Sequence, residues 1–349
     1  MKATQNIGIL TLPFEPNYGF ILQAYALFRV LKDNGLNPIL LNRGWNQRST
    51  SIIYKIKRYV YYTYLCHDIQ KFFNRINHTD VIRNSDDLYN QCLSLKLSKI
   101  VVGSDQVWAI PNTRGVGLNY FFDFLPSDTG IQRYSYAASF GKDKLNATPE
   151  EIAKIKKLLP LFDIISVRED SGVEILRNEF GIGSKCVIDP TLLLSKDIWQ
   201  EFILNKRDSK ELVTYILDEN DEKSTAISKL ANYRGLKVHN LYNRRFRPYF
   251  TVEHWLTKIC NAEFVVVDSF HGMVFAILFE KQFVVITNKK RGETRFISLL
   301  RKLGLEDRLI KNAAELNTRV FSEIDYNQVR PLLQKERDQS MQIINQICS

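Results

Sequence analysis

Short β-rich runs alternate with helical patterns along this sequence, and the alternation constrains the fold more than any other feature. Predicted strands of a first series cover 7–13, 37–42, 99–105, 133–139, 163–169 and 185–190. A second series begins near Glu211, with predicted strands at 212–218, 237–242, 263–269 and 282–286. Strands that alternate with helices form βαβ units around a parallel sheet. The sequence therefore predicts an α/β protein with two Rossmann-like domains that face each other across a cleft.

A polar segment marks the predicted boundary between these two domains. The segment 204–211, LNKRDSKE, separates the two series of strands. We predict an N-terminal domain at 1–204, a C-terminal domain at 205–325 and a final helix at 326–349. The length of 349 residues fits two domains, because a domain commonly holds about 100–200 residues.

Cysteine content and hydrophobic run lengths exclude several classes of protein. The five cysteines are scattered, with no C-x-x-C pair and no Cys/His cluster, so neither a zinc site nor a disulfide framework is expected. Such thiols fit a reducing compartment, and we expect a cytoplasmic protein. The apolar run 7–12 is too short for the core of a signal peptide. Charged and ionisable residues interrupt the longer run 264–286, which argues against a transmembrane helix.

The chain is basic, with 48 Lys and Arg against 38 Asp and Glu, a net charge of +10 and a pI of about 9.2. This charge fits a nucleic acid, an anionic membrane surface or an anionic small substrate. The sequence lacks the interleaved basic and aromatic motifs of nucleic-acid-binding modules, so we do not expect a nucleic-acid partner. Charge alone does not distinguish the other two.

The run 264–279, FVVVDSFHGMVFAILF, places three polar residues in the middle of thirteen that are apolar or glycine. We expect a buried strand, a turn holding Asp268, Ser269 and His271, and then a helix. Ligands of open parallel sheets bind beyond the carboxyl ends of strands, and a helix N-terminus favours anions. Gly272 would let a ligand approach the backbone. The alternative is that Asp268 or Ser269 caps the helix and His271 is a buried core residue.

Two further strand ends carry candidate site residues. Asp105 follows a buried strand and a glycine in VVGSDQVW, and its alternative role is a turn closed by an Asx hydrogen bond. Arg168 follows another strand in ISVRED, where it can grip a carboxylate or phosphate, or else pair with Glu169 or with the next helix. Asp170 is expected to be the N-cap of that helix.

Weaker signals come from a glycine and from a basic loop. Gly19 precedes a helical pattern in the position of a phosphate-binding glycine, but a single glycine is weak support. The segment 287–296, TNKKRGETRF, follows the last strand of the second series. It is either a solvated charged loop or a loop that grips phosphate.

Taken together, six motifs resemble the polysaccharide pyruvyl transferase family. They are NYGFILQAYAL, VVGSDQVW, SYAASFG, ISVRED, IDPTLLL and VVDSFHGMVFAILF, in the family's order and within 7–300. The resemblance implies a two-domain fold like that of GT-B glycosyltransferases. It also implies a phosphoenolpyruvate donor, a saccharide acceptor and a pyruvate ketal as product. No cofactor and no metal are implied.

The resemblance also assigns candidate site residues. In the family an aspartate, an arginine and an Arg-x-His motif hold the donor, and these positions match Asp105, Arg168 and His271. The chain departs from the family at Ser269, where the motif has arginine. A cation from the following loop is expected to replace it. Residues predicted to contact substrate are Asn17, Gly19, Gln23, Ser104, Ser139, Ser269, Gly272, Lys289, Arg291 and Arg295.

The implied reaction gives the three matched residues their expected roles. The donor is a trianion, and ketal formation requires a proton on its methylene carbon and attack of a sugar hydroxyl on C2. Arg168 is expected to clamp the carboxylate or phosphate. His271 is expected to hold the phosphate and to act as the general acid, and Asp105 to take the proton from the sugar hydroxyl.

The acceptor side depends on the segment 51–73, which mixes Lys and Arg with five tyrosines and apolar residues at near-helical spacing. Such a segment can lie in a membrane interface at the inner face of the membrane, which would suit a saccharide carried on a lipid diphosphate. The alternative is an ordinary amphipathic helix packed on the first domain.

Two other functions compete with the pyruvyl transferase. A glycosyltransferase that uses a nucleotide sugar shares the expected fold, and its ribose would need a carboxylate, for which Asp268 is the weak candidate. A non-catalytic nucleic-acid-binding protein is the remote alternative.

Overall fold

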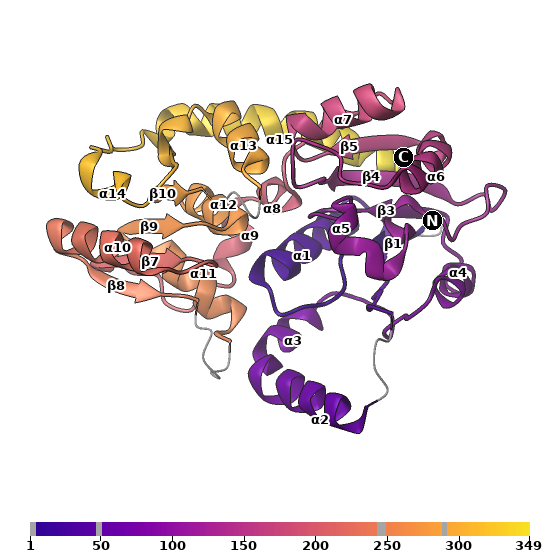
Figure 1. Cartoon of the computed structure of the whole chain (residues 1–349), viewed down its shortest axis with the longest axis horizontal. Coiled ribbons are helices and arrows are strands. Elements are labelled where there is room, and N and C mark those ends of the chain that lie inside the picture. Colours follow the sequence, from indigo (N-terminus) through magenta and orange to yellow (C-terminus); the bar gives the residue numbers. More distant parts are fainter. Residues whose placement is uncertain (1–4, 47–50, 243–248, 288–291) are drawn as a thin grey trace. The chain divides into compact units, whose positions relative to one another are not determined.

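Figure 1 shows the computed structural model of the chain, which describes residues 5–46, 51–242, 249–287 and 292–349. For Tyr54, Lys55 and Arg58 it describes the backbone alone. The chain divides into two compact units, and each unit has its own parallel sheet. The first unit comprises Met1–Tyr59, Phe73–Leu193 and Glu336–Ser349, and the second comprises Val60–Phe72 and Leu194–Lys335.

The first unit contains a six-stranded parallel sheet with the strand order β2-β1-β3-β4-β5-β6. Its strands are β1 (Asn6–Leu10), β2 (Asn37–Leu40), β3 (Lys99–Val102), β4 (Gln132–Ala138), β5 (Ile164–Val167) and β6 (Lys185–Cys186). Every residue of β3 is buried, which explains why this strand lacks an alternating polar pattern. The chain winds in opposite directions from β1 to β2 and from β1 to β3. Ligand sites of open α/β sheets lie at such a reversal.

Helices cover both faces of this sheet. They are α1 (Tyr18–Asp33), α4 (Ser85–Ser94), α5 (Ile110–Thr113), η2 (Arg114–Val116), η3 (Asn119–Phe121), α6 (Pro149–Leu158), η4 (Leu159–Leu161), α7 (Asp170–Phe180) and α8 (Pro190–Leu193). One buried cluster joins Ile100 and Val102 of β3 to Leu88 of α4 and Leu176 of α7. The helical pattern near Gly19 is α1, whose last residue Asp33 is followed by the C-cap Asn34 and by Gly35, which has φ +86°.

The second unit repeats the same winding in a five-stranded parallel sheet of order β11-β10-β9-β7-β8. Its strands are β7 (Glu211–Tyr215), β8 (Lys237–Asn240), β9 (Phe264–Val267), β10 (Gln282–Ile286) and β11 (Leu309–Ile310). The reversal of strand order here lies between β7 and β9. The two predicted series of strands are therefore two sheets with equivalent switch points.

The helices of the second unit also pack on both faces of its sheet. They are α9 (Lys196–Gln200), α10 (Asp221–Arg234), α11 (Val252–Asn261), α12 (Phe270–Leu278), α13 (Thr294–Leu303), η5 (Glu306–Arg308) and α14 (Glu315–Thr318). Leu212 and Val266 pack with Leu230 of α10 on one face. Aromatic contacts join Tyr215 to Trp255 of α11. Both faces of β9 are buried, as its continuous apolar run predicts.

Four elements lie at the limits of the units: α2 (Ile52–Val60), the π-helical turn η1 (Tyr61–Leu65), α3 (His67–Phe73) and α15 (Tyr326–Cys348). The final helix was predicted at 326–349, and the end of α15 belongs to the first unit. Lys99 Nζ donates a hydrogen bond to the carbonyl of Ile347 at 2.8 Å, and the Ile188 amide donates one to Ser340 Oγ at 3.1 Å. These contacts explain why a C-terminal segment joins the N-terminal sheet.

The main segment of the second unit begins at Leu194, eleven residues before Asn205, where the C-terminal domain was predicted to start. The buried side chain of Trp199 accounts for the difference, because its ring lies 4.9 Å from that of Phe275 in α12. Phe202 similarly lies 5.3 Å from Phe72, which belongs to the second unit. The polar segment 204–211 thus follows the change of unit. Among the described helices, none has both the length and the apolar character needed to cross a membrane.

Candidate functional site

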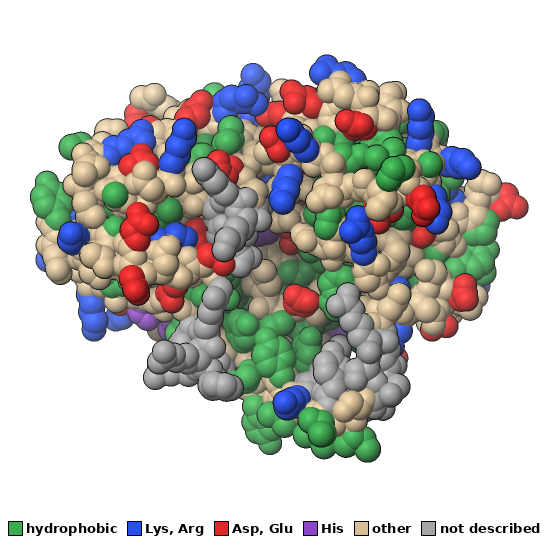
Figure 2. Space-filling model, in the orientation of Figure 1, with side chains coloured by type: hydrophobic (Ala, Val, Ile, Leu, Met, Phe, Trp, Pro, Cys, Tyr) green, Lys and Arg blue, Asp and Glu red, His purple; other side chains and the backbone are tan. Residues whose placement is uncertain are grey.

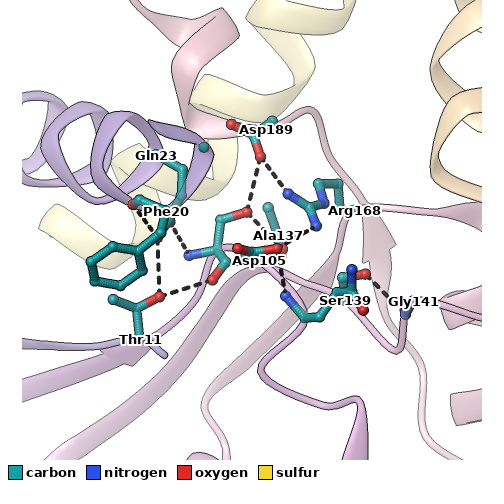
Figure 3. Close-up of polar contacts among 12 residues, drawn as sticks. Thr11, Phe20, Gln23, Asp105, Ala137, Ser139, Gly141, Arg168 and Asp189 are labelled. Carbon is teal, nitrogen blue, oxygen red and sulfur yellow. Dashed lines mark hydrogen bonds and ion pairs between the residues drawn. The ribbon is translucent and has the colours of Figure 1, made fainter. Parts of the chain in front are cut away.

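The switch point of the first sheet is held together by buried polar side chains. Gln23 Nε2 donates a hydrogen bond to Thr11 Oγ1 at 3.1 Å, and Gln23 Oε1 accepts one from the Ser104 amide at 2.9 Å. Thr11 Oγ1 donates to the Ser104 carbonyl at 3.1 Å. Figure 3 shows Gln23 of α1 beside Thr11, which follows β1. Ser104 follows β3, so the three residues join α1 to the ends of two strands. The loop after β3 is therefore held in place by side chains that have almost no exposed surface.

The next layer of the site is an ion pair between Arg168 and two aspartates (Figure 3). Arg168 Nη1 donates to Asp189 Oδ2 at 2.7 Å, and Arg168 Nη2 donates to Asp105 Oδ1 at 3.2 Å. Asp189 Oδ2 also accepts from Ser104 Oγ at 3.2 Å, while its Oδ1 accepts from Thr191 Oγ1 at 2.7 Å. The ends of β3 and β5 are thus linked to the segment after β6 through one aspartate.

Burial and charge act in opposite directions on Arg168. The side chain is 1 % exposed, and burial alone would lower the pKa of its guanidinium. The negative charges of Asp189 and Asp105 reverse this effect and raise the pKa above its usual value. The arginine therefore stays a cation, and two of its N–H groups are used by carboxylates within the unit. These contacts favour a positioning role for Arg168, and the expected clamp on a substrate anion stays a prediction.

Asp105 is the more accessible member of this group, with a side chain that is 14 % exposed. Its backbone has φ +77°, a left-handed conformation that aspartate tolerates better than most residues. Its Oδ1 accepts a hydrogen bond from the Gln106 amide at 2.9 Å as well as from Arg168. The contact with Gln106 is to the next residue, whereas an Asx turn uses the amide two residues on; the Val107 amide donates to the backbone carbonyl of Asp105 at 2.8 Å. The contacts with Gln106 and Arg168 together fix the direction of the carboxylate.

Glu169 supports the neighbouring loop through one of its carboxylate oxygens. Its Oε1 accepts hydrogen bonds from Ser139 Oγ at 2.9 Å, from the Phe140 amide at 2.8 Å and from the Gly141 amide at 3.2 Å. Glu169 is also the N-cap residue of α7, which begins at Asp170. The prediction that Asp170 caps this helix is therefore wrong by one residue.

Gly103, which precedes Ser104, has no room for a side chain. A Cβ there would lie 2.0 Å from the carbonyl oxygen of Tyr136, and the backbone has φ +129°. We expect Gly103→Ala to lower the free energy of unfolding by about 3–5 kcal/mol, because the rigid backbone of β4 cannot move aside. Gly130 is the matched control, since it has φ +69° with no atom near its Cβ position.

Urea unfolding of both variants measures the difference. Gly130→Ala should cost only about 1–2 kcal/mol, the price of a left-handed alanine. Equal effects of the two substitutions would mean that the close approach of Gly103 to Tyr136 does not constrain the loop.

In the second unit, Asp268 ties the switch point together. Its Oδ1 accepts from the Leu217 amide at 2.6 Å, and its Oδ2 accepts from the Asp218 amide at 3.2 Å and from Lys223 Nζ at 2.8 Å. The side chain of Asp268 is fully buried. Both carboxylate oxygens are therefore used within the unit, which leaves this aspartate poorly suited to bind a ribose.

His271 lies in the first turn of α12, as the sequence predicts. Ser269 is the N-cap of this helix and accepts a hydrogen bond from the Gly272 amide at 3.5 Å. A Cβ on Gly272 would lie 2.9 Å from Val267 Cγ1, so this glycine lets α12 pack closely on β9. The His271 ring lies 5.4 Å from that of Phe270 in an edge-to-face arrangement. The cap described as the alternative for Ser269 is present, together with a histidine at a helix N-terminus.

Arg295 is the described cation of the basic loop and α13 that lies beside this turn. Its guanidinium carbon is 5.6 Å from the centroid of the Phe270 ring, and its side chain is largely buried. Phe270 lies between the N-cap Ser269 and His271 in the sequence. The structure therefore places a guanidinium against the ring of Phe270, the residue that follows Ser269. Lys289 and Arg291 lie outside the described residues.

A sequence-family model for polysaccharide pyruvyl transferase matches residues 17–290, which is most of the chain. The matched range contains the strand-end residues of both units described above. The chain belongs to the polysaccharide pyruvyl transferase family. No protein with a curated description matches this sequence.

Solved structures show which fold this pyruvyl transferase family member adopts. UDP-N-acetylglucosamine 2-epimerase from Rickettsia bellii matches with a TM-score of 0.54 and 11% identity, over 99% of this chain and 97% of that one. A putative enzyme of the same name from Listeria monocytogenes matches with a TM-score of 0.55 and 10% identity, over 97% and 91%. These neighbours have the GT-B fold, so the predicted fold class is confirmed. At such low identity they indicate fold alone.

Several residues that were predicted to contact substrate have supporting roles in this pyruvyl transferase family member. Gln23, Ser104 and Ser139 have no exposed surface, and their polar groups bond within the first unit. Asn17 is the N-cap of α1 and accepts from the Gly19 and Phe20 amides at 2.8 and 3.3 Å. These contacts hold the loops in place, and the predicted contacts of the four residues with substrate stay predictions.

Asp189, Thr191 and Lys223 were not predicted as parts of the site. Asp189 had a usable signal, because it lies at the carboxyl end of the predicted strand 185–190 and in the motif IDPTLLL. Lys223 had no such signal in the sequence, since a lysine in a helix is normally expected at the protein surface. Among the described residues, no three or more His, Cys, Asp or Glu side chains are grouped to hold a metal ion.

Proposed function

We propose that the chain transfers the pyruvate moiety of phosphoenolpyruvate to a saccharide, forming a pyruvate ketal with release of phosphate. The observation that carries this proposal is the family match over residues 17–290, which includes the strand-end motifs of both sheets. The positions of Asp105 and His271 beyond the carboxyl ends of β3 and β9 support it, because ligands of such sheets bind there.

The proposed reaction balances without a redox step. The methylene carbon of the donor gains a proton, and one sugar hydroxyl adds to C2 and loses its proton. Phosphate leaves from C2, and a second hydroxyl of the sugar closes the ketal ring with loss of its own proton. The chain must therefore supply a general acid, a general base and cations for the anionic groups.

The described residues suggest how these tasks are divided. His271 acts as the general acid, and the N-terminus of α12 binds the phosphate through its free amides and its dipole. Asp105 takes the proton from the sugar hydroxyl. Arg168 and Asp189 act through Asp105, because the buried ion pair fixes the direction of its carboxylate.

Arg295 takes the place of the arginine that the family motif has at Ser269. Replacing it by methionine, which keeps most of the volume, should raise KM for phosphoenolpyruvate about tenfold or more, since a charge-assisted contact contributes about 1.5–3 kcal/mol. Arg301 of α13 provides the control, because Arg301→Met removes an equal charge from an exposed position of the same helix. A KM unchanged by Arg295→Met would remove this residue from donor binding.

Isothermal titration tests the donor class directly and separates the proposal from the main alternative. A nucleotide-sugar glycosyltransferase shares the fold and needs a carboxylate to bind the ribose of its donor. Asp268 is poorly suited to this, because its two oxygens already accept three hydrogen bonds. We expect heat of binding with phosphoenolpyruvate and none with UDP-sugars. Binding of a UDP-sugar without binding of phosphoenolpyruvate would overturn the proposal in favour of glycosyl transfer.

A further inference from the structure

The helix α2 and the turn η1 expose an unusual amount of apolar side-chain surface. Ile52, Ile56, Tyr59 and Val60 follow the spacing i, i+4, i+7 and i+8, which places them on one face of α2. Together with Ile53 and Tyr64, these side chains are 45 to 72 % exposed. Figure 2 shows hydrophobic side chains gathered over this part of the chain. We call these six residues the α2 apolar face.

The segment that carries the α2 apolar face is also basic. Residues 51–67 contain Lys55, Lys57 and Arg58 but no aspartate or glutamate. Lys57 is exposed. An apolar face in a segment whose charged residues are all basic, on a helix too short to span a bilayer, is typical of helices that lie in the plane of an anionic membrane surface.

The C-terminal end of this segment is fixed to the second unit. The Tyr249 amide donates a hydrogen bond to the Leu65 carbonyl at 2.9 Å, and Phe72 packs against Phe202 with ring centroids 5.3 Å apart. Cys66 and Ile69 are fully buried. The apolar side chains of 52–60 therefore remain exposed although the adjoining elements are packed.

We propose that the α2 apolar face docks on an anionic lipid bilayer, with the isoleucines and tyrosines in the interface and the cations at the headgroups. A second copy of the chain is the less suitable occupant. In a two-fold contact the segment of one copy meets the same segment of the other, so a sequence with three cations and no acidic residue would be brought against itself. An anionic bilayer instead supplies charges of opposite sign.

The net charge of +10 supports the same occupant, because it attracts the whole chain to a negative surface. The inference rests on exposure and charge and does not require the proposed reaction. If the proposed reaction also holds, docking would bring the chain to saccharides carried on lipid diphosphates. That additional step rests on the proposed function.

Co-sedimentation of the full chain with vesicles tests the proposal. We expect binding to vesicles of phosphatidylcholine with phosphatidylglycerol at low salt, and little binding to phosphatidylcholine alone. The double substitution Ile53→Glu/Ile56→Glu should reduce binding at least about tenfold, because two apolar contacts are lost and two negative charges are added. Val320→Glu is the matched control, since Val320 is also exposed and lies far along the chain, between α14 and α15.

Melting curves, a charge variant and sedimentation velocity complete the vesicle experiment. Because both isoleucines are exposed, the double variant should keep the wild-type melting temperature. Lys57→Glu provides an independent variant and should weaken binding to the anionic vesicles. Absence of wild-type binding to anionic vesicles, or equal binding by the double variant, would overturn the proposal. So would a wild-type dimer in sedimentation velocity that the double variant abolishes, which would assign the face to a second copy.

Discussion

Replacing His271 by glutamine should lower kcat for ketal formation by about 10²-fold or more, the range found when a general acid is removed. Glutamine keeps a polar side chain of similar size at this buried position in α12, so packing on Phe270 is largely retained. The expected change is in kcat, with a smaller change in KM for phosphoenolpyruvate, because the amide can still donate to a phosphate but cannot deliver a proton.

The control for this substitution is His67→Gln, which makes the same change at an exposed position of α3. Its turnover should equal that of the wild type. Steady-state kinetics with both variants, together with melting curves to confirm folding, measures the effect. Turnover close to normal in the His271 variant would remove this residue from the mechanism.

Asp189→Asn should lower the free energy of unfolding by about 3–5 kcal/mol, the cost of leaving one partner of a buried ion pair uncompensated. Asp189 has no exposed side-chain surface, and its Oδ2 accepts from both Arg168 and Ser104. An amide nitrogen at this place would face two donors. Catalysis should fall as well, because Asp105 would lose the fixed arginine that orients it.

Asp105→Asn is the matched comparison for stability. Its side chain is partly exposed and its contact with Arg168 is longer, at 3.2 Å, so the expected cost is about 1 kcal/mol or less. In the double variant Arg168→Met/Asp189→Asn, part of the loss should be recovered, because the buried guanidinium that lost Asp189 is no longer there. Urea unfolding measures all three. If Asp189→Asn lowers the free energy of unfolding by less than Asp105→Asn does, Asp189 does not neutralise Arg168.

The alternation of strands and helices was predictable because it is a local property of the sequence. A strand that is buried on both faces has a continuous apolar sequence. A polar residue follows at the end of the strand, where the chain enters a loop or meets solvent. This pattern located Asp105, Arg168 and His271 at the carboxyl ends of their strands. The glycine in αL conformation after α1 was likewise predictable from Gly35 alone.

Partner choice was not predictable, because it depends on the order of strands in the sheet. Arg168 is next to Glu169 in the sequence, yet it pairs with Asp189 and Asp105. The β5–β6 and β3–β4 pairings bring those carboxylates to the same edge. Similarly, nothing local indicates that Asp268 binds Lys223, or that Trp199 attaches its segment to the second unit. The predicted cleft between the domains stays a prediction.

Release of inorganic phosphate from phosphoenolpyruvate, assayed with a panel of saccharide acceptors, tests the proposed reaction most directly. We predict phosphate release that requires an acceptor, equals the acid-labile pyruvate bound to that acceptor, and is lost in the His271→Gln variant. The contradictory result is a folded wild-type chain that releases no phosphate with any acceptor but transfers a sugar from a nucleotide donor.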